Sequence, residues 1–264
     1  MSVHEIQAID VHGHYGPYRR GQQLIDRFLT LDAAGVVARA RLAETRLTIV
    51  SPLSGLLPRN EADAFAANKE AAQIVAETEG LLQWVIVHPL QPKTFEQARR
   101  MLGHPKCVGI KIHPEEHCYP IREHGRTLFE FAAEFDAVLL AHSGDPNSSP
   151  GDFVSLANAH TNVRLILAHL GNGGAAYGDP TLQVRAIQEC RNGNVFVDTS
   201  SARSITPGLI EWAVAEIGSE RILFGTDTPL YFAPMQRIRI DQADISDDDK
   251  RRILCKNAEE LWGL

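Results

Sequence analysis

Short apolar runs recur along the chain, and most end in a polar or ionisable residue that is followed by a stretch with helical spacing. Eight such runs occur: Ala8–His14, Leu47–Pro52, Gln83–Pro89, Val108–Pro114, Ala137–Gly144, Arg164–Gly171, Val195–Ser200 and Arg221–Pro229. Continuous apolar runs of this length, bounded by Gly, Pro and Ser, are typical of strands buried on both faces of a parallel sheet. The pattern therefore predicts eight parallel strands.

The stretches between these runs predict helices. Apolar residues keep helical spacing from Ala64 to Val75. Thr206 followed by Pro207 predicts the start of another helix. Ser246, with Asp249 three residues later, predicts a capping box for a helix near the C-terminus.

Eight strands that alternate with helices favour an α/β fold, a (β/α)8 TIM barrel that occupies residues 1–264 as a single domain. The competing fold is an open, doubly wound sheet. That fold predicts a glycine-rich phosphate loop after the first strand, and the sequence there, GHYGPYRRG, is not GxGxxG. In a barrel, all strand ends open onto one mouth, which fits the ionisable residues that end nearly every run.

Composition narrows the function classes. The 264 residues are 44% hydrophobic and 22% charged, which is ordinary for a globular protein. The net charge of −7 without a Lys/Arg block argues against nucleic acid and against an anionic membrane surface as partners. No signal peptide is readable, and the four cysteines lack paired spacing, so we expect a cytoplasmic protein with reduced thiols. The sequence leaves open whether the protein forms a homodimer.

The first strand carries candidate chemistry at its end. Side chains alternate along a strand, so Asp10, His12 and His14 share the face that points into a barrel, and Ile9 and Val11 face the helices. Two histidines at i and i+2 have the right separation to chelate one ion. Alone, this H-x-H pattern is a weak signal, because histidines on strands are common without a metal.

Three further strands add ligand-type residues at their ends, namely His142, His169 and Asp227. Four imidazoles and a carboxylate at one mouth would be costly to bury without a shared partner. A divalent metal is such a partner, and this donor set suits Zn²⁺ best, with Mn²⁺ or Fe²⁺ as alternatives. The sequence therefore predicts a metal site at the C-terminal mouth of the barrel.

The ordered motifs resemble a known family. H-x-H on the first strand, G-I-K-x-H-P on the fourth, A-H-S-G on the fifth, A-H-L-G on the sixth and G-T-D on the eighth are similar to the amidohydrolase superfamily. The branch most similar to it is the amidohydrolase-related group that includes aminocarboxymuconate-semialdehyde decarboxylase. The closing segment KNAEELWGL also resembles that group, so the resemblance runs from Ile9 to Leu264.

The resemblance implies roles for the strand-end residues. His12, His14, His142 and Asp227 would bind one divalent metal ion. Asp227 would also move a proton between a metal-activated water and the leaving group. His169 would not bind the metal but would hydrogen-bond the metal-bound water or the substrate oxyanion, and so stabilise negative charge.

The role of Lys111 has three possible interpretations. It is a buried lysine paired with Asp10 or another carboxylate, a carboxylated lysine that bridges two metals as in binuclear relatives, or a charge that binds substrate or tunes the metal.

Further residues are candidates for contact with a small-molecule substrate. His113 shares a strand face with Lys111, and His88 ends the third predicted strand. Arg203 and Arg59 are candidates to receive a substrate carboxylate in a bidentate manner, and Tyr15 to stack on a ring. Asp198 is a candidate to orient a ligand histidine. The remaining histidines receive no role: His4, His104, His117, His124 and His160.

Two enzyme functions and one binding function compete. The leading expectation is a metal-dependent hydrolase of a small amide, ester or lactone. The alternative is a metal-dependent, non-oxidative decarboxylase of an unsaturated or aromatic acid, which the short chain disfavours because decarboxylating relatives tend to be longer. A barrel that binds without turnover is disfavoured by the complete ligand set. Substrate specificity would lie in the loops at the mouth: Tyr15–Gln22, Ser54–Asn60, Glu115–Glu123, Asp145–Gly151, Asn172–Asp179 and Tyr231–Ile240.

Overall fold

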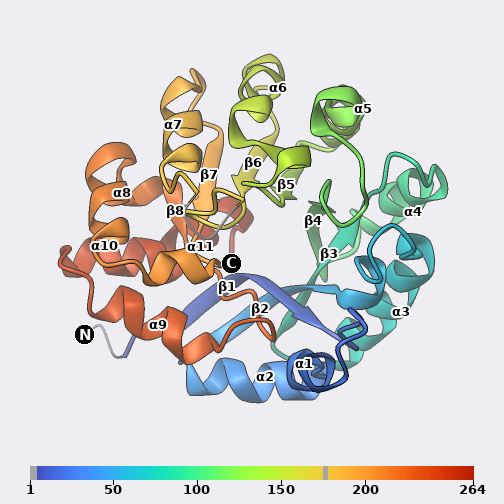
Figure 1. Cartoon of the computed structure of the whole chain (residues 1–264), viewed down its shortest axis with the longest axis horizontal. Coiled ribbons are helices and arrows are strands. Elements are labelled where there is room, and N and C mark those ends of the chain that lie inside the picture. The colour runs from blue at the N-terminus through green and yellow to red at the C-terminus, as the bar shows by residue number, and fades with distance from the viewer. Residues whose placement is uncertain (1–4, 175–177) are drawn as a thin grey trace.

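The computed structural model describes residues 5–174 and 178–264 of the chain, and in it eight parallel strands form a barrel (Figure 1). Each strand pairs with the next in sequence. The strands are β1 (Ala8–Tyr15), β2 (Thr45–Pro52), β3 (Leu81–Ile86), β4 (Cys107–Ile112), β5 (Val138–Ala141), β6 (Arg164–Leu167), β7 (Val195–Asp198) and β8 (Ile222–Leu223). The predicted (β/α)8 TIM barrel is confirmed.

Hydrogen bonds between β1 and the segment after β8 close the ring. The amide of Val11 donates to the carbonyl of Phe224 at 2.9 Å, and that of His14 to the carbonyl of Thr228 at 2.6 Å. Gly13 and Thr228 form a parallel bridge. A Cβ at Gly13 would lie 2.6 Å from the Thr48 side chain, so glycine permits this close approach of strands.

Helices surround the barrel (Figure 1). They are α1 (Gln23–Leu29), α2 (Ala33–Leu42), α3 (Ala64–Glu77), α4 (Lys93–Met101), α5 (Ile121–Ala133), α6 (Val154–Ala159), α7 (Leu182–Glu189), α8 (Leu209–Ile217), α9 (Ala233–Asp241), α10 (Asp247–Arg251) and α11 (Asn257–Trp262). Within the described ranges, none is long and apolar enough to cross a bilayer.

One predicted helix start agrees with the structure, and another lies a few residues later than predicted. The capping box forms at α10, where the Ser246 hydroxyl accepts from the amide of Asp249 at 3.1 Å. Helix α8 begins at Leu209, later than Thr206 and Pro207 predict. Thr206 instead ends a 3-10 turn, its amide donating to the carbonyl of Arg203, and Gly208 takes a left-handed conformation before the helix.

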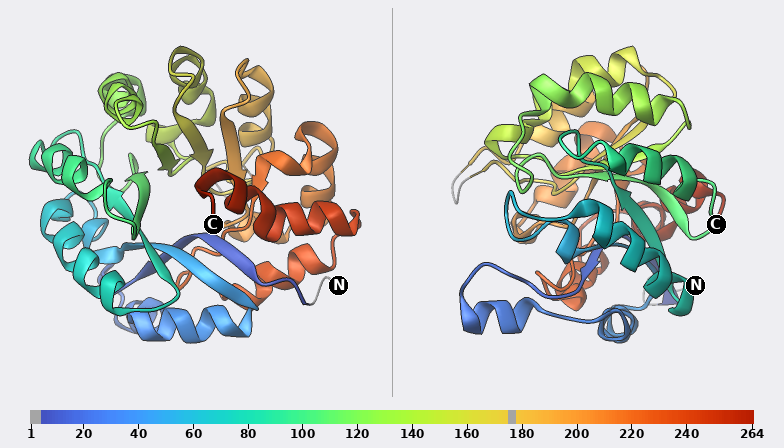
Figure 2. Two further views of the ribbon diagram at one scale, coloured as in Figure 1. Left: turned by 180° about the vertical axis from the view of Figure 1, so that it is seen from behind. Right: turned by 90° about the vertical axis from the view of Figure 1, so that its right-hand side faces the viewer.

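Tryptophans fill the end of the barrel opposite the predicted mouth. The fully buried Trp84 of β3 donates its indole N–H to the Val11 carbonyl at 2.9 Å. A Cβ at Gly109 would lie 2.5 Å from its ring. Trp262 of α11 packs edge-on against Trp84 and bonds the carbonyl of Val108 at the start of β4. Figure 2 shows the C-terminal helix lying across this end, which leaves the opposite end as the site of polar chemistry.

Candidate metal centre

Three of the predicted ligands converge at the carboxyl end of the strands. His12 and His14 come from β1, and Asp227 follows β8. The Asp227 carboxylate lies 3.1 Å from His14 Nε2 and 3.7 Å from His12 Nε2. One ligand atom from each residue lies within 4.8 Å of the others, and all three side chains are buried. This geometry is that of two imidazoles and a carboxylate ready to share one cation.

The backbone brings Asp227 toward β1. Its amide donates to the carbonyl of His12 at 2.7 Å, and the residue takes a left-handed conformation with φ of 55°. That conformation is uncommon for a residue with a side chain and is associated with functional positions. His14 is fixed from the other side, because its Nδ1 lies 3.0 Å from the Ser51 hydroxyl of β2.

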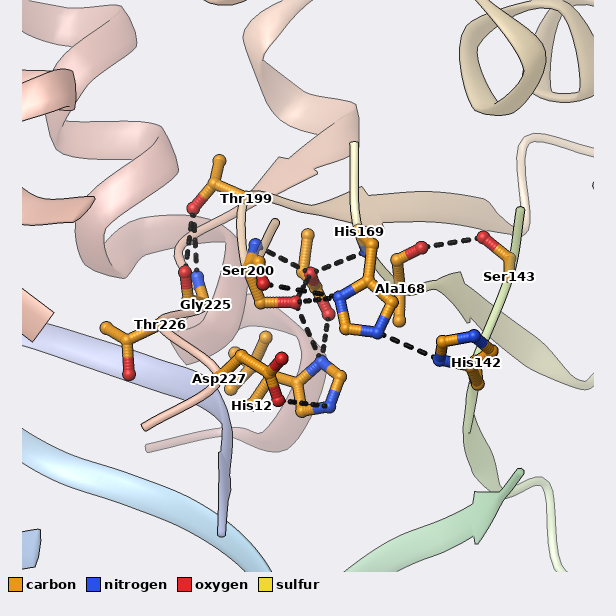
Figure 3. Close-up of polar contacts among 12 residues, drawn as sticks. His12, His142, Ser143, Ala168, His169, Thr199, Ser200, Gly225, Thr226 and Asp227 are labelled. Atoms are coloured by element: carbon orange, nitrogen blue, oxygen red, sulfur yellow. Dashed lines mark hydrogen bonds and ion pairs between the residues drawn. The ribbon is translucent and has the colours of Figure 1, made fainter. Parts of the chain in front are cut away.

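His142 and His169 form a second pair beside this group. His142 Nδ1 lies 3.0 Å from His169 Nε2, as Figure 3 shows, and His142 Nε2 lies 2.6 Å from the carboxylate of Asp145. His169 also has a left-handed backbone, with φ of 72°, and its Nδ1 lies 2.9 Å from the Ser200 hydroxyl. The metal-ligand role of His142 and the catalytic role of His169 stay predictions.

Asp198, at the end of β7, fixes the orientation of His12. Its Oδ2 bonds His12 Nδ1 at 2.8 Å, and its Oδ1 accepts from the amides of His169 and Ser200. His12, His169 and Asp198 also satisfy the geometry of a three-ligand group. Both oxygens of Asp198 are used in these bonds, which agrees with its predicted role in orienting His12.

The protonation states in this cluster fit a cation. Burial lowers the pKa of His12 to about 4 and that of His169 to about 3, so both rings are neutral at pH 7. Burial acts to raise the pKa of Asp227, but the hydrogen bond from His14 and the nearby imidazoles outweigh it and lower the value to about 2. Neutral imidazole and ionised carboxylate are the forms that metal binding requires. The residues present therefore fit a divalent metal.

Lys111 lies beneath the cluster. It is fully buried, and its Nζ lies 2.9 Å from His12 Nε2. Burial lowers the pKa of its ammonium to about 8, against the favourable charges of Asp227 and Asp198. The partner proposed for it, Asp10, instead accepts bonds from Thr226 and the His12 amide. The structure thus places Lys111 against His12, and the chemical role of Lys111 stays a prediction.

A pocket of about 250 Å³ opens above the cluster. His12, His14 and Asp227 line it together with His142 and His169. Leucines form an apolar part of its lining: Leu53, Leu56, Leu57 and Leu230. The volume is at the small end of ligand sites, which suits a compact molecule with an apolar body and a polar head.

The other candidate substrate contacts divide into two groups. His113 lines the pocket and stacks on His142, with ring centroids 4.1 Å apart. The residues that line this pocket do not include His88, Tyr15, Arg59 or Arg203. His88 stacks on His117 at 4.2 Å, and Arg59 pairs with Glu115 at 2.6 Å.

Several lining residues were not singled out from the sequence: Tyr18, Arg20, Glu116, Asp145 and Asn172. The signal for Arg20 and Tyr18 was their place in the loop directly after the H-x-H strand. His4 and residues 175–177, part of the Asn172–Asp179 loop, lie outside the described residues.

The fold and the side chains at its mouth define the class of protein as a (β/α)8 barrel with a candidate metal site. The amidohydrolase family model matches residues 9–264, so the chain belongs to the amidohydrolase family, a family of enzymes. This bears out the resemblance drawn from the strand-end motifs. A search of curated proteins finds no match.

Solved structures with the same fold include decarboxylases. A 2,6-dihydroxybenzoate decarboxylase in complex with 2,6-dihydroxybenzoate has a TM-score of 0.76 at 16% identity, and the match covers 100% of both chains. A dihydroxybenzoic acid decarboxylase from Polaromonas, with manganese and the inhibitor 2-nitroresorcinol, has a TM-score of 0.74 at 17% identity, covering 100% of this chain and 98% of the other.

A third similar structure is a 5-carboxyvanillate decarboxylase from Novosphingobium aromaticivorans, in complex with manganese and 4-hydroxy-3-methoxy-5-nitrobenzoic acid. Its TM-score is 0.71 at 14% identity, and the match covers 98% of this chain and 96% of the other.

These findings correct the expectation of hydrolysis. The three similar structures described above are decarboxylases of aromatic acids, which agrees with the alternative function and not with the leading one. The preference for hydrolysis that chain length suggested is therefore wrong. A divalent metal is supported by the group His12, His14 and Asp227, but zinc in particular is not, because the metal named in two of these three structures is manganese.

Proposed function

We propose that this protein is a divalent-metal-dependent, non-oxidative decarboxylase of a small aromatic or unsaturated carboxylic acid. The observation that carries the proposal is the two-sided pocket, with histidines and Asp227 on one part of its lining and four leucines on another. A flat ring with acidic oxygens at one edge matches both parts. The similarity in fold to decarboxylases of hydroxylated benzoic acids supports the same substrate class.

His12, His14 and Asp227 would hold the metal, with His142 as the fourth ligand that the family resemblance implies. When bound, the cation supplies a Lewis acid that binds substrate oxygens and stabilises negative charge on them. Imidazole and carboxylate ligands accept Mn²⁺ as well as Zn²⁺. We propose Mn²⁺ as the first metal to test and Zn²⁺ as the second.

Asp227 would manage the proton. Decarboxylation breaks the bond between the ring carbon and the carboxyl carbon, and the electron pair remains on the ring carbon, which must then receive a proton. With a pKa of about 2, Asp227 starts as a carboxylate. It would take the proton of an acidic substrate hydroxyl on binding and return it to the ring carbon as CO₂ leaves.

His169 would stabilise the charge that develops during this step. Its neutral ring is held by Ser200 on one side and His142 on the other, so its orientation is set before substrate binds. The leucine side of the pocket would exclude water from the reacting ring, which strengthens such electrostatic contacts.

The test is to load the purified protein with Mn²⁺ or Zn²⁺ and supply 2,6-dihydroxybenzoate or 5-carboxyvanillate. We expect CO₂ and the ring compound without the lost carboxyl group. In D₂O, one deuterium should appear at the carbon that lost it. Metal-loaded protein that releases no CO₂ from these acids or from a panel of unsaturated acids would refute the proposal. Binding without turnover would refute it equally.

A further inference from the structure

Acidic side chains surround the space that an acid substrate has to enter. Four carboxylates line the pocket: Glu115, Glu116, Asp145 and Asp227. Among the described residues of this lining, Arg20 is the one with a permanently positive side chain. Arg20 lies in the loop between β1 and α1 and is partly exposed, whereas His12 and His14 are almost fully buried. The arginine thus stands at the mouth and the metal cluster at the floor.

The loop that carries Arg20 is fixed by helix α1. Both oxygens of Asp26 are used: Oδ1 accepts from the amide of Arg20 at 3.1 Å and Oδ2 from that of Gly21 at 3.0 Å. The Tyr18 amide donates to the Thr30 hydroxyl at 2.9 Å. These bonds set where the guanidinium group leaves the backbone, so its position at the mouth is built into the loop.

Glu116 uses only one of the N–H groups of the Arg20 side chain. One nitrogen of Arg20, Nη2, bonds one oxygen of Glu116, Oε1, and the two residues come from different loops. The other oxygen, Oε2, is buried and has no hydrogen-bond partner among the described residues. A guanidinium group has five N–H donors and binds a carboxylate best with two parallel bonds. Arg20 also forms a side-chain hydrogen bond with Tyr18. These two contacts use only part of the guanidinium group, so its remaining N–H donors leave Arg20 able to bind a better-placed carboxylate.

A neighbouring pair gives a contrast. Glu115 bonds Arg59 at 2.6 Å and also lies 3.3 Å from the amide of Asn147, which donates to its other oxygen. Both oxygens of this glutamate are used, and Arg59 is not part of the pocket lining. Of the two arginine–glutamate pairs at this rim, only that of Arg20 combines a cation facing the pocket with an incompletely bonded carboxylate.

We infer that Arg20 binds a second acidic group of the substrate, opposite the edge that meets the metal cluster, and that Glu116 occupies the guanidinium group when no such substrate is bound. The inference rests on the proposed function and deepens it. The preferred substrate is an aromatic or unsaturated acid with one carboxylate to lose and another at the far end of the molecule. Between these ends, its ring meets Leu53, Leu56 and Leu57.

Two ligands that differ by this one group provide the test. 4-Hydroxy-3-methoxy-5-nitrobenzoic acid has a nitro group in place of a reactive carboxylate and keeps a second carboxylate. 2-Methoxy-6-nitrophenol is the same molecule without that carboxylate. Calorimetric titration of the Mn²⁺-loaded protein gives a Kd for each. We expect the acid to bind the parent protein about 10- to 100-fold more tightly, as for charge-assisted hydrogen bonds to one carboxylate.

Arg20→Gln should abolish this preference and leave the Kd of the phenol unchanged. The double variant Arg20→Gln/Glu116→Gln should lose it as well, which separates loss of the cation from repulsion by an unpaired Glu116. Glu116→Gln alone should tighten binding of the acid, because the internal competitor is gone. Arg126→Gln, which removes an exposed arginine paired with Glu130, is the matched control and should keep the preference.

Three results would overturn the inference: Arg20→Gln weakens both ligands equally, it leaves the Kd of the acid unchanged, or Arg59→Gln removes the preference instead. Turnover of 2,6-dihydroxybenzoate, which has no second carboxylate, tests the proposed function separately. CO₂ release without any effect of Arg20 on binding would overturn only the inference. Arg20-dependent binding without CO₂ release from any acid would overturn only the proposed function.

Discussion

Two groups of histidines lie in or near the C-terminal mouth of the barrel, and they differ in what surrounds their rings. The metal cluster consists of His12, His14, His142, His169 and Asp227. The aromatic stack consists of His88, His117, Tyr119 and His124, with His88 and His117 almost parallel at 4.2 Å. Both groups are rich in imidazole. Among the described residues, two groups have the geometry to hold a metal ion: His12, His14 and Asp227, and His12, His169 and Asp198. Both groups take their histidines from the metal cluster, and neither includes a residue of the stack.

In the stack, His88 and His117 each use a ring nitrogen in a hydrogen bond to the backbone. His117 Nε2 lies 2.8 Å from the Gly55 carbonyl, and His88 Nδ1 accepts from the Leu90 amide. His117 Nδ1 and the Tyr119 hydroxyl are buried, with no hydrogen-bond partner within the described part of the chain. The contrast teaches that imidazole density alone does not mark a metal site. A buried carboxylate held among the imidazole rings does.

The largest expected effect tests that rule at Asp227. Asp227→Asn replaces the ionised ligand by an amide that binds metal poorly and cannot carry the proton. We expect metal content to fall and decarboxylation to drop by several orders of magnitude. The same change in the stack, His88→Asn, should leave the metal content at the parent level. Elemental analysis and initial rates decide, and an Asp227→Asn protein with full metal and full rate would remove the rule.

The next effect separates two histidines within the metal cluster. His169→Asn should keep most of its metal, because His169 is assigned to charge stabilisation, and should lose about 10²–10³ in turnover. His12→Ala should lose the metal itself. Measuring metal content and kcat for both variants compares the roles directly. If His169→Asn loses metal as completely as His12→Ala, His169 is a ligand.

The smallest expected effect concerns the contribution of the aromatic stack to stability at acidic pH. Burial lowers the pKa of His117 to about 3 and that of His88 to about 4. Because these values lie below that of an unfolded histidine, about 6.5, the unfolded state binds more protons in the window between them. This contribution to stability is present above pH 6.5 and is lost as pH falls toward 4.

His117→Gln keeps a donor for Gly55 and removes one of these titrations. We expect Tm at pH 7.5 to fall by a few degrees, about 2–4 °C per kcal/mol for a chain of this size. Between pH 6.5 and 4, Tm should fall less steeply than in the parent. The exposed His104→Gln is the control. An unchanged slope in His117→Gln would show that the stack does not set the acid sensitivity.

The sequence predicted the barrel well because strand periodicity is a local property. Its weakness lies at strand ends. The run Arg221–Pro229 was assigned to one strand, but β8 ends at Leu223 and the Phe224 amide bonds the carbonyl of Ile253. Asp227 therefore reaches the cluster through a left-handed turn and not through strand alternation. The same holds for His169, which follows the end of β6.

The convergence of His12, His14 and Asp227 was nevertheless predictable, since the carboxyl ends of parallel strands share one mouth. The loop Tyr15–Gln22 was predicted to contribute to the mouth, but Arg20 within it was not singled out. Its place depends on the amides of Arg20 and Gly21, which donate to Asp26. Loop arginines such as Arg59 carry no sequence signal that distinguishes a pocket from its rim.

The pairing of β1 with the segment after β8 has a consequence for synthesis on the ribosome. Strand β1 emerges first, yet its Gly13 pairs with Thr228, and the chain after β8 is held by the helical segment at Ile253. One edge of the growing sheet therefore stays unpaired until nearly the whole chain has left the exit tunnel. Exposed strand edges promote association with other chains. Nascent chains of this protein should thus need protection by chaperones until the segment after β8 has emerged.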